Sequence, residues 1–254
     1  MSLFPVKATI VAELRADRLV LAGGNYFKAS ALTDDFIYNK VLAAEADAAR
    51  RLRVFLESTT VFAGEPSADE IAAVGTAPWA EESGYDYEPE LWNTEDWGYL
   101  VLRNKLVSSV ASVEFVYPSP VAGVFRMPDN WIRLDKKAGH IRFVPAGSNM
   151  SVGSFGSMIL TMMAGGRHVP QMLKIRYVAG MVNAARDSPD LIDLIKKMAV
   201  LRIINDAFVP QSGSISADGL SQSFSADVDK FASGVDAALN ALRESIHGIR
   251  CMVL

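Results

Sequence analysis

Residues 172–208, MLKIRYVAGMVNAARDSPDLIDLIKKMAVLRIINDAF, place a predicted β-strand shortly before a predicted helix. The first nine, MLKIRYVAG, are rich in β-branched and aromatic residues, which favours a strand. Ser188-Pro189-Asp190 then supplies a cap, a proline for the first turn and an acid near the positive end of the helix dipole. The helix should run to about Phe208, before Pro210. It is apolar on nearly all sides and must be covered on more than one face.

A β-rich region is predicted from about Tyr99 to Met181, because β-branched and aromatic residues alternate there between turn signals. In residues 130–145, NWIRLDKKAGHIRFVP, two alternating runs flank a loop with Gly139, which predicts a hairpin. Residues 107–117, VSSVASVEFVY, form a further strand candidate. Residues 7–14, KATIVAEL, and 18–23, RLVLAG, are expected to pair as an N-terminal ribbon.

Two further helices are predicted from apolar residues three or four positions apart. In residues 34–57, with Thr33 as N-cap, this face consists of Ile37, Val41, Ala44, Ala48, Leu52 and Phe55. A helix after Ser225, with Gly248 as C-cap, carries Val228, Phe231, Val235, Leu239, Leu242 and Ile246. The Ser- and Gly-rich stretch 211–225 is predicted to be a long loop.

These patterns predict an α+β fold, with a helical bundle core and an inserted β-rich region. We expect a β ribbon or arm at 1–30, the helical core at 31–60 and 186–247, the β-rich insertion at 61–185, and a C-terminal tail at 248–254. Half of the 254 residues are hydrophobic, so the chain can bury a sizeable core.

Composition narrows the function classes. The net charge is −4 and no run of Lys and Arg occurs, which argues against a protein that grips nucleic acid. The first residues do not predict a secretory signal, because Glu13, Arg15 and Asp17 interrupt them, and no apolar stretch approaches the roughly 20 residues of a membrane span. Cys251 is the single cysteine, so we expect no internal disulfide, as in a reducing cytoplasm.

No arrangement of residues predicts catalysis. His140, His168 and His247 lack the spacing of a metal site, and we expect structural or surface roles for them. Ser154 lies in Gly-Ser-Phe-Gly, which does not match the nucleophile-elbow pattern Gly-x-Ser-x-Gly. Phosphate-binding and dinucleotide motifs are missing. We therefore predict no catalytic, cofactor-binding or metal-binding residues.

Residues 79–99, WAEESGYDYEPELWNTEDWGY, combine many acids with three of the four tryptophans and contain no Lys or Arg. Acids such as Glu81, Glu82, Asp86, Glu95 and Asp96 are candidate calcium ligands without EF-hand spacing, and Trp79, Trp92 and Trp97 are candidate sugar-stacking residues. Alternatively, the aromatic residues pack on the β region or on a neighbouring subunit while the acids stay solvated.

The order of these motifs resembles the head-to-tail connector (adaptor) family of tailed phages. The likeness covers roughly residues 34–208. It comprises Asp34-Asp35 before an alanine-rich helix, then 97–104 (WGYLVLRN), 106–115 (LVSSVASVEF), 141–147 (IRFVPAG), 174–180 (KIRYVAG) and 188–195 (SPDLIDLI). In that family a strand ending in Tyr-x-Ala-Gly leads through a short loop with a proline into a core helix. The residues here that match this signature are Tyr177, Ala179, Gly180 and Pro189.

The resemblance implies a non-enzymatic virion protein, made in the bacterial cytoplasm and located in the virion neck. It implies a homo-oligomeric ring of about twelve copies, docked beneath the portal protein and above a tail-side neck or tail-terminator protein. It implies no catalytic residues and no cofactor. DNA is expected to pass through the lumen without specific binding, since phosphates are gripped mainly by Lys and Arg clusters.

An excess of apolar surface agrees with assembly, because neighbouring copies would cover it. The candidate interface residues lie in the helix after Pro189 and in the C-terminal tail: Leu191, Ile195, Met198, Ile203, Ile249, Arg250, Met252 and Leu254. Helices 34–57 and 189–208 are expected to make lateral contacts, and the tail to reach an adjacent ring. The alternatives are another virion protein, such as a tail-completion or decoration protein, a sugar- or calcium-binding module, and an enzyme using Ser154.

Overall fold

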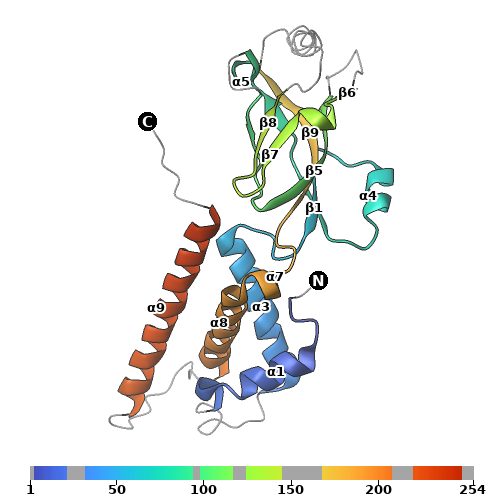
Figure 1. Ribbon diagram of the computed structural model, residues 1–254. Helices are drawn as coiled ribbons and strands as arrows, with labels where there is room; N and C mark the ends of the chain where they lie inside the picture. Colours follow the sequence, from blue (N-terminus) through green and yellow to red (C-terminus); the bar gives the residue numbers. More distant parts are fainter. Residues whose placement is uncertain are drawn as a thin grey trace. The chain divides into compact units, whose positions relative to one another are not determined.

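The computed structural model describes residues 3–21, 32–93, 98–116, 124–144, 168–207 and 220–247. The chain forms two compact units (Figure 1), a helical unit from Met1–Leu56 and Asn183–Leu254 and a β-rich unit from Glu57–Val182. The predicted α+β fold is confirmed. The β-rich unit begins at Glu57 rather than at 61 and ends at Val182 rather than at 185, because its first strand starts at Thr59 and its last strand ends at Ala179.

Helix α3 (Asp34–Leu52) lies at the centre of the helical unit. The Thr33 hydroxyl accepts a hydrogen bond from the Phe36 amide at 3.2 Å, as expected of an N-cap. The helix ends at Leu52 and not at Glu57, because Arg53 adopts a left-handed conformation with φ 54°. The predicted face is confirmed over the helix itself, with Ile37, Val41, Ala44, Ala48 and Leu52 all fully buried.

The prediction of an N-terminal β ribbon is wrong. Residues Lys7–Arg15 form helix α1, which packs on α3 and buries Ile10, Val11 and Leu14. An Arg15–Asp34 ion pair at 2.6 Å and a Lys7–Asp35 ion pair add links between the two helices. Alternation and helical spacing are hard to separate in so short a segment, and the contact with α3 decides between them.

Helix α8 (Pro189–Ala207) follows a short helix α7 (Ala184–Asp187) and packs on α3. Helix α9 (Leu220–His247) contacts α8 and α3. It begins before the predicted start, so residues 220–225 belong to the helix and not to the predicted loop 211–225. Its expected C-cap, Gly248, lies outside the described residues.

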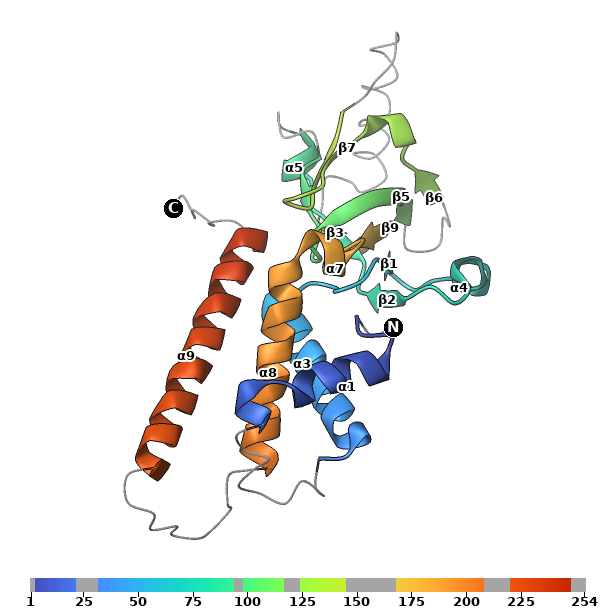
Figure 2. The ribbon, with the colours of Figure 1, turned by 60° about the horizontal axis from the view of Figure 1, so that its bottom comes forward.

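The larger sheet of the β-rich unit has the strand order β2-β1-β9-β5-β6, and β3 also pairs with β9. Its strands are β1 (Thr59–Ala63), β2 (Trp79–Glu82), β3 (Tyr85–Tyr87), β5 (Val107–Val116), β6 (Val124–Arg126) and β9 (Val169–Ala179). Strands β5 and β9 confirm two predictions. Helix α4 (Ala68–Val74) lies between β1 and β2 in the chain and projects beside them (Figure 2).

A second sheet has the strand order β4-β8-β7, from β4 (Leu100–Val101), β7 (Ile132–Asp135) and β8 (His140–Phe143). A 3-10 turn, η2 (Asp129–Trp131), precedes β7, and helix α5 (Glu90–Asn93) precedes β4. The predicted hairpin is confirmed as β7–β8. Its turn contains Gly139 at φ 66°, and Asp135 Oδ1 accepts the Lys137 and Ala138 amides at 3.1 Å each.

Candidate functional site

The interface residues predicted on α8 are buried inside their own chain. Leu191, Ile195 and Ile203 have no exposed surface, and Met198 is 5% exposed. Helix α3 covers one side of α8 and α9 contacts another, which explains why α8 has apolar residues on more than one side, while Asp193 and Lys197 stay exposed. The predicted lateral contacts through these four side chains are therefore wrong. The other predicted interface residues, Ile249, Arg250, Met252 and Leu254, lie outside the described residues.

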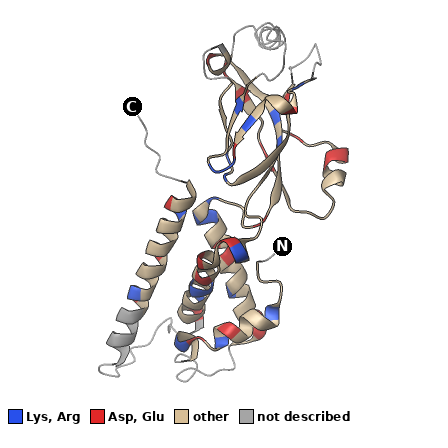
Figure 3. Cartoon of the chain, in the orientation of Figure 1, with Lys and Arg blue, Asp and Glu red and all other residues tan. Residues whose placement is uncertain are grey.

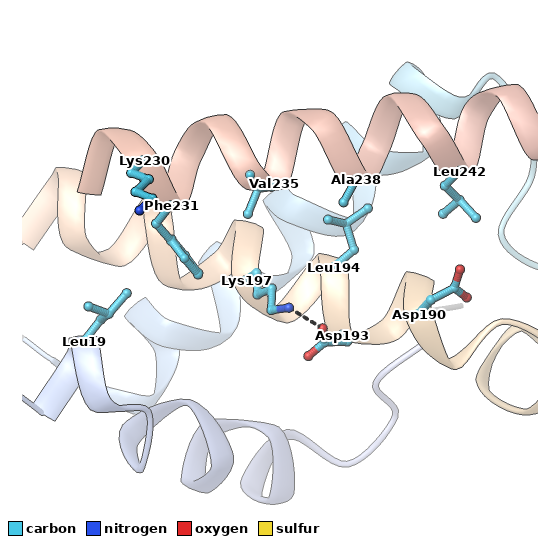
Figure 4. Close-up of a pocket in the computed structure, with 11 residues that line it drawn as sticks. Leu19, Asp190, Asp193, Leu194, Lys197, Lys230, Phe231, Val235, Ala238 and Leu242 are labelled. Atoms are coloured by element: carbon cyan, nitrogen blue, oxygen red, sulfur yellow. Dashed lines mark ion pairs between the residues drawn. The ribbon is translucent and has the colours of Figure 1, made fainter. Parts of the chain in front are cut away.

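A groove of about 640 Å³ opens between α8 and α9 (Figure 4). Leu194 of α8 and Phe231, Val235 and Leu242 of α9 contribute apolar side chains to it. Lys197 and Asp193 lie on its α8 side and form an ion pair at 2.7 Å. The groove thus combines apolar side chains from both helices with an ion pair on its α8 side.

The signature residues Tyr177, Ala179 and Gly180 occupy the end of β9. Ala179 is fully buried and pairs with Thr59 of β1 on one side and Val107 of β5 on the other. Gly180 has φ 108°, and its amide donates to the Leu106 carbonyl at 3.2 Å. A side chain there would be strained, so glycine lets β9 leave the sheet at this point. Pro189 is the first residue of α8.

Tyr177 belongs to a polar cluster around Glu82. Glu82 Oε1 accepts hydrogen bonds from Tyr85 Oη at 2.7 Å and Tyr177 Oη at 2.9 Å, and Oε2 accepts from Asn104 Nδ2 at 3.1 Å. Burial is the main cause that raises the pKa of Tyr85 and of Tyr177, so both hydroxyls stay protonated and act as donors. The cluster links β2, β3 and β9 to the loop before β5.

The sequence did not reveal this cluster, because the acids of 79–99 were expected either to bind calcium or to stay solvated. The Glu82 side chain is only 13% exposed, whereas Glu81 points to solvent. Alternation along β2 places Glu81 and Glu82 on opposite faces of the strand. It shows which of the two acids faces the protein only once the pairing of β2 with β1 is known. Glu95 and Asp96 lie outside the described residues. Within the described part of the chain, no His, Cys, Asp and Glu side chains are grouped to hold a metal ion.

The aromatic residues of the same segment pack against the protein. Trp92 stacks on Phe143 at 5.0 Å and on Tyr87 at 5.9 Å between ring centroids, and meets Phe115 edge-on at 5.2 Å. Its faces are therefore covered and unavailable to a sugar. Trp79 is 42% exposed, and Trp97 lies outside the described residues. This arrangement matches the alternative in which the aromatic residues pack on the β region.

A second polar link fastens α4 to the large sheet. Arg176 Nε donates to Glu70 Oε1 at 2.6 Å and Nη2 to Oε2 at 3.2 Å, and the guanidinium also donates to the carbonyls of Ala63, Gly64 and Glu65. These hydrogen bonds to Arg176 lower the pKa of Glu70 to about 2. Glu70 and Ser67 also form a capping box at the start of α4.

The remaining sequence candidates do not come together in a site. His140 contacts Tyr99 in the β-rich unit, His168 Nε2 lies 3.5 Å from Asp86 Oδ2, and His247 approaches the Leu52 carbonyl in the helical unit. Ser154 lies outside the described residues.

None of the described helices combines the length and apolar composition that crossing a bilayer requires. No protein-family model matches the sequence, and no curated protein matches it significantly.

Proposed function

We propose that the chain is a structural subunit of a virus particle, a ring-forming adaptor that joins the head of a tailed phage to its tail. One observation carries the proposal. Helices α3 and α8 pack into one unit although the whole β-rich unit is inserted between them in the sequence. This is the arrangement that the resemblance to the connector family implies.

The junction between the units supports the same proposal. The β-rich unit starts with β1 and finishes with β9, and Thr59 pairs directly with Ala179, so the chain enters and leaves this unit on adjacent strands. After Gly180 the chain reaches α8 within nine residues, through α7. The family signature Tyr177, Ala179, Gly180 and Pro189 thus falls at the exit of the inserted unit and the start of the core helix.

The apolar side chains of α8 are buried within the chain, so they no longer support ring assembly. The proposal therefore depends on element order and not on hydrophobicity. We therefore expect contacts between copies to involve other surfaces of the helical unit and residues 248–254, whose sequence GIRCMVL is largely apolar. The proposed partners are sister copies, the portal protein, and a tail-side neck or tail-terminator protein.

The test is to mix the purified full-length chain with isolated portal protein and to image the mixture by electron microscopy. We expect rings stacked on the portal. A tail-completion or decoration protein would leave the portal bare and bind tail tubes or capsid shells, which would contradict the adaptor proposal.

Removal of Arg250–Leu254 tests the tail as a contact segment. Assembly should weaken while helix content by circular dichroism stays unchanged, because terminal residues outside a core are dispensable for folding. A matched variant keeps the chain length but replaces these five residues with serine and glycine, and it should behave like the truncation. Loss of helicity in either variant would instead assign the tail to the core.

A further inference from the structure

The solvent-facing side of the small sheet gathers basic and aromatic side chains. Strand pairing sets Arg133 directly opposite Arg142, and Asp135 opposite His140. Tyr99, which precedes β4, lies beside them, and its hydroxyl is 3.0 Å from His140 Nδ1. Together these residues line a hollow of about 460 Å³. We call this surface, made of Tyr99, Arg133, His140 and Arg142, the arginine face.

The two arginines stand in an electrostatically unfavourable arrangement. Like charges directly opposite each other on one sheet face repel. Both side chains are exposed, and neither forms an ion pair within the part of the chain that the structure describes. The nearby Asp135 already accepts two turn amides through Oδ1. An anion between the guanidiniums would relieve this repulsion.

Neighbouring contacts hold the arginines in place. The Arg142 guanidinium lies over the Tyr99 ring, 5.4 Å from its centroid. Arg133 Nη1 donates to the Asn130 carbonyl at 3.0 Å, which leaves its other nitrogens available. Guanidinium groups held in this way match the paired oxygens of a phosphate group.

Further positive charge extends along the same hairpin (Figure 3). Lys136 and Lys137 are exposed in the turn between β7 and β8. Lys105 donates to the Ala138 carbonyl at 2.6 Å, and after burial its charge is the next cause that lowers the pKa of His140. Lys105 itself is buried, so the exposed cations are Arg133, Arg142, Lys136 and Lys137. A four-residue strand spans about 13 Å, so the exposed charges of the hairpin suit several phosphates better than a single ion.

We propose that the arginine face and the β7–β8 turn bind the phosphodiester backbone of double-stranded DNA without regard to its sequence. Because the contacts are with phosphates, binding weakens as the salt concentration rises, and the small number of cations keeps it weak at physiological salt. Sequence composition gave no sign of such a surface, because Arg133 and Arg142 lie on different strands and only the pairing of β7 with β8 sets them opposite each other. The inference concerns the free chain and does not depend on ring assembly.

The test uses the full-length chain and a fluorescent duplex of about 20 base pairs, with anisotropy measured from about 50 to 200 mM salt. Replacing Arg133→Gln and Arg142→Gln together should raise Kd about tenfold at low salt and reduce the salt slope by about two. The matched control, Lys230→Gln with Arg243→Gln, removes two exposed positive charges from α9 and should change Kd less than twofold. Arg133→Lys with Arg142→Lys keeps the charge and should retain most of the affinity.

Equal Kd values for wild type and the double glutamine variant would overturn the proposal. A rise in Kd for the α9 control as large as that for the double glutamine variant would also overturn it. Binding of inorganic phosphate without duplex binding would show that the arginine face is an adventitious ion site only, and it would overturn the proposal. Binding to anionic lipid vesicles without duplex binding would also overturn it. Portal imaging with the glutamine variant separates the two proposals, because ring formation should survive when DNA binding is lost.

Discussion

At the scale of single residues, two buried polar clusters hold the β-rich unit together. Glu82 gathers two tyrosines and an asparagine, and Arg176 joins Glu70 to three backbone carbonyls. Neither cluster was visible in the sequence, because its members lie up to 113 positions apart and meet only through strand pairing. Buried polar groups generally have hydrogen-bond partners, but only the strand pairing determines which residues supply them here.

Glu82→Gln should lower the free energy of unfolding by about 1–2 kcal/mol, because one carboxylate accepts three hydrogen bonds there. Urea unfolding followed by tryptophan fluorescence measures this loss. Glu81→Gln is the control, since Glu81 is an exposed neighbour on the same strand, and it should stay within about 0.5 kcal/mol of wild type. Equal losses in the two variants would refute the role assigned to Glu82.

Glu70→Gln should cost about 1 kcal/mol near neutral pH, a modest loss because the Glu70 side chain is 36% exposed and solvent screens the pair. The folded-state pKa of Glu70 is about 2, below the usual 4.5, so its contribution is complete above pH 4.5 and disappears as pH falls towards 2. Urea unfolding at several pH values should show wild type and variant converging in acid. Asp69→Asn, at an exposed site on the same helix turn, should show no such convergence.

At the scale of elements, the sequence predicted α3, β5, β9, the β7–β8 hairpin and α8, because each has a sustained period or a clear cap. It failed for α1, where Ile10 and Leu14 fit a helix only once α3 is present to cover them. It also placed the start of α9 too late, because residues 220–225 have the composition of a loop. Periodicity showed that α8 needed covering but could not show that α3 and α9 would cover it.

Among the α9 side chains that the structure describes, Val235 and Leu239 are buried. Leu239→Ala should lower the free energy of unfolding of the helical unit by about 2–3 kcal/mol, since the side chain is 3% exposed. Leu242→Ala, at a half-buried position lining the groove, should cost less than half as much. Thermal unfolding followed at 222 nm checks the pair, and a larger loss for Leu242→Ala would contradict the described packing.

At the scale of the whole molecule, the chain consists of a helical unit with a β-rich unit inserted into it. The excised segment 57–182 should fold alone, because its first and last strands pair with each other from Thr59↔Ala179 to Ala63↔Ile175. Far-UV circular dichroism and a cooperative urea transition measure this. A matched segment that starts at 64 lacks β1 and should not unfold cooperatively. An unstructured 57–182 segment would contradict the division into two units.

We propose that this chain forms an adaptor ring, and the mass of its complex with the portal protein tests this proposal. Native mass spectrometry of the mixture should show the portal oligomer gaining a whole number of 27.6 kDa chains, about twelve of them. A free 27.6 kDa chain beside a portal of unchanged mass would contradict the account.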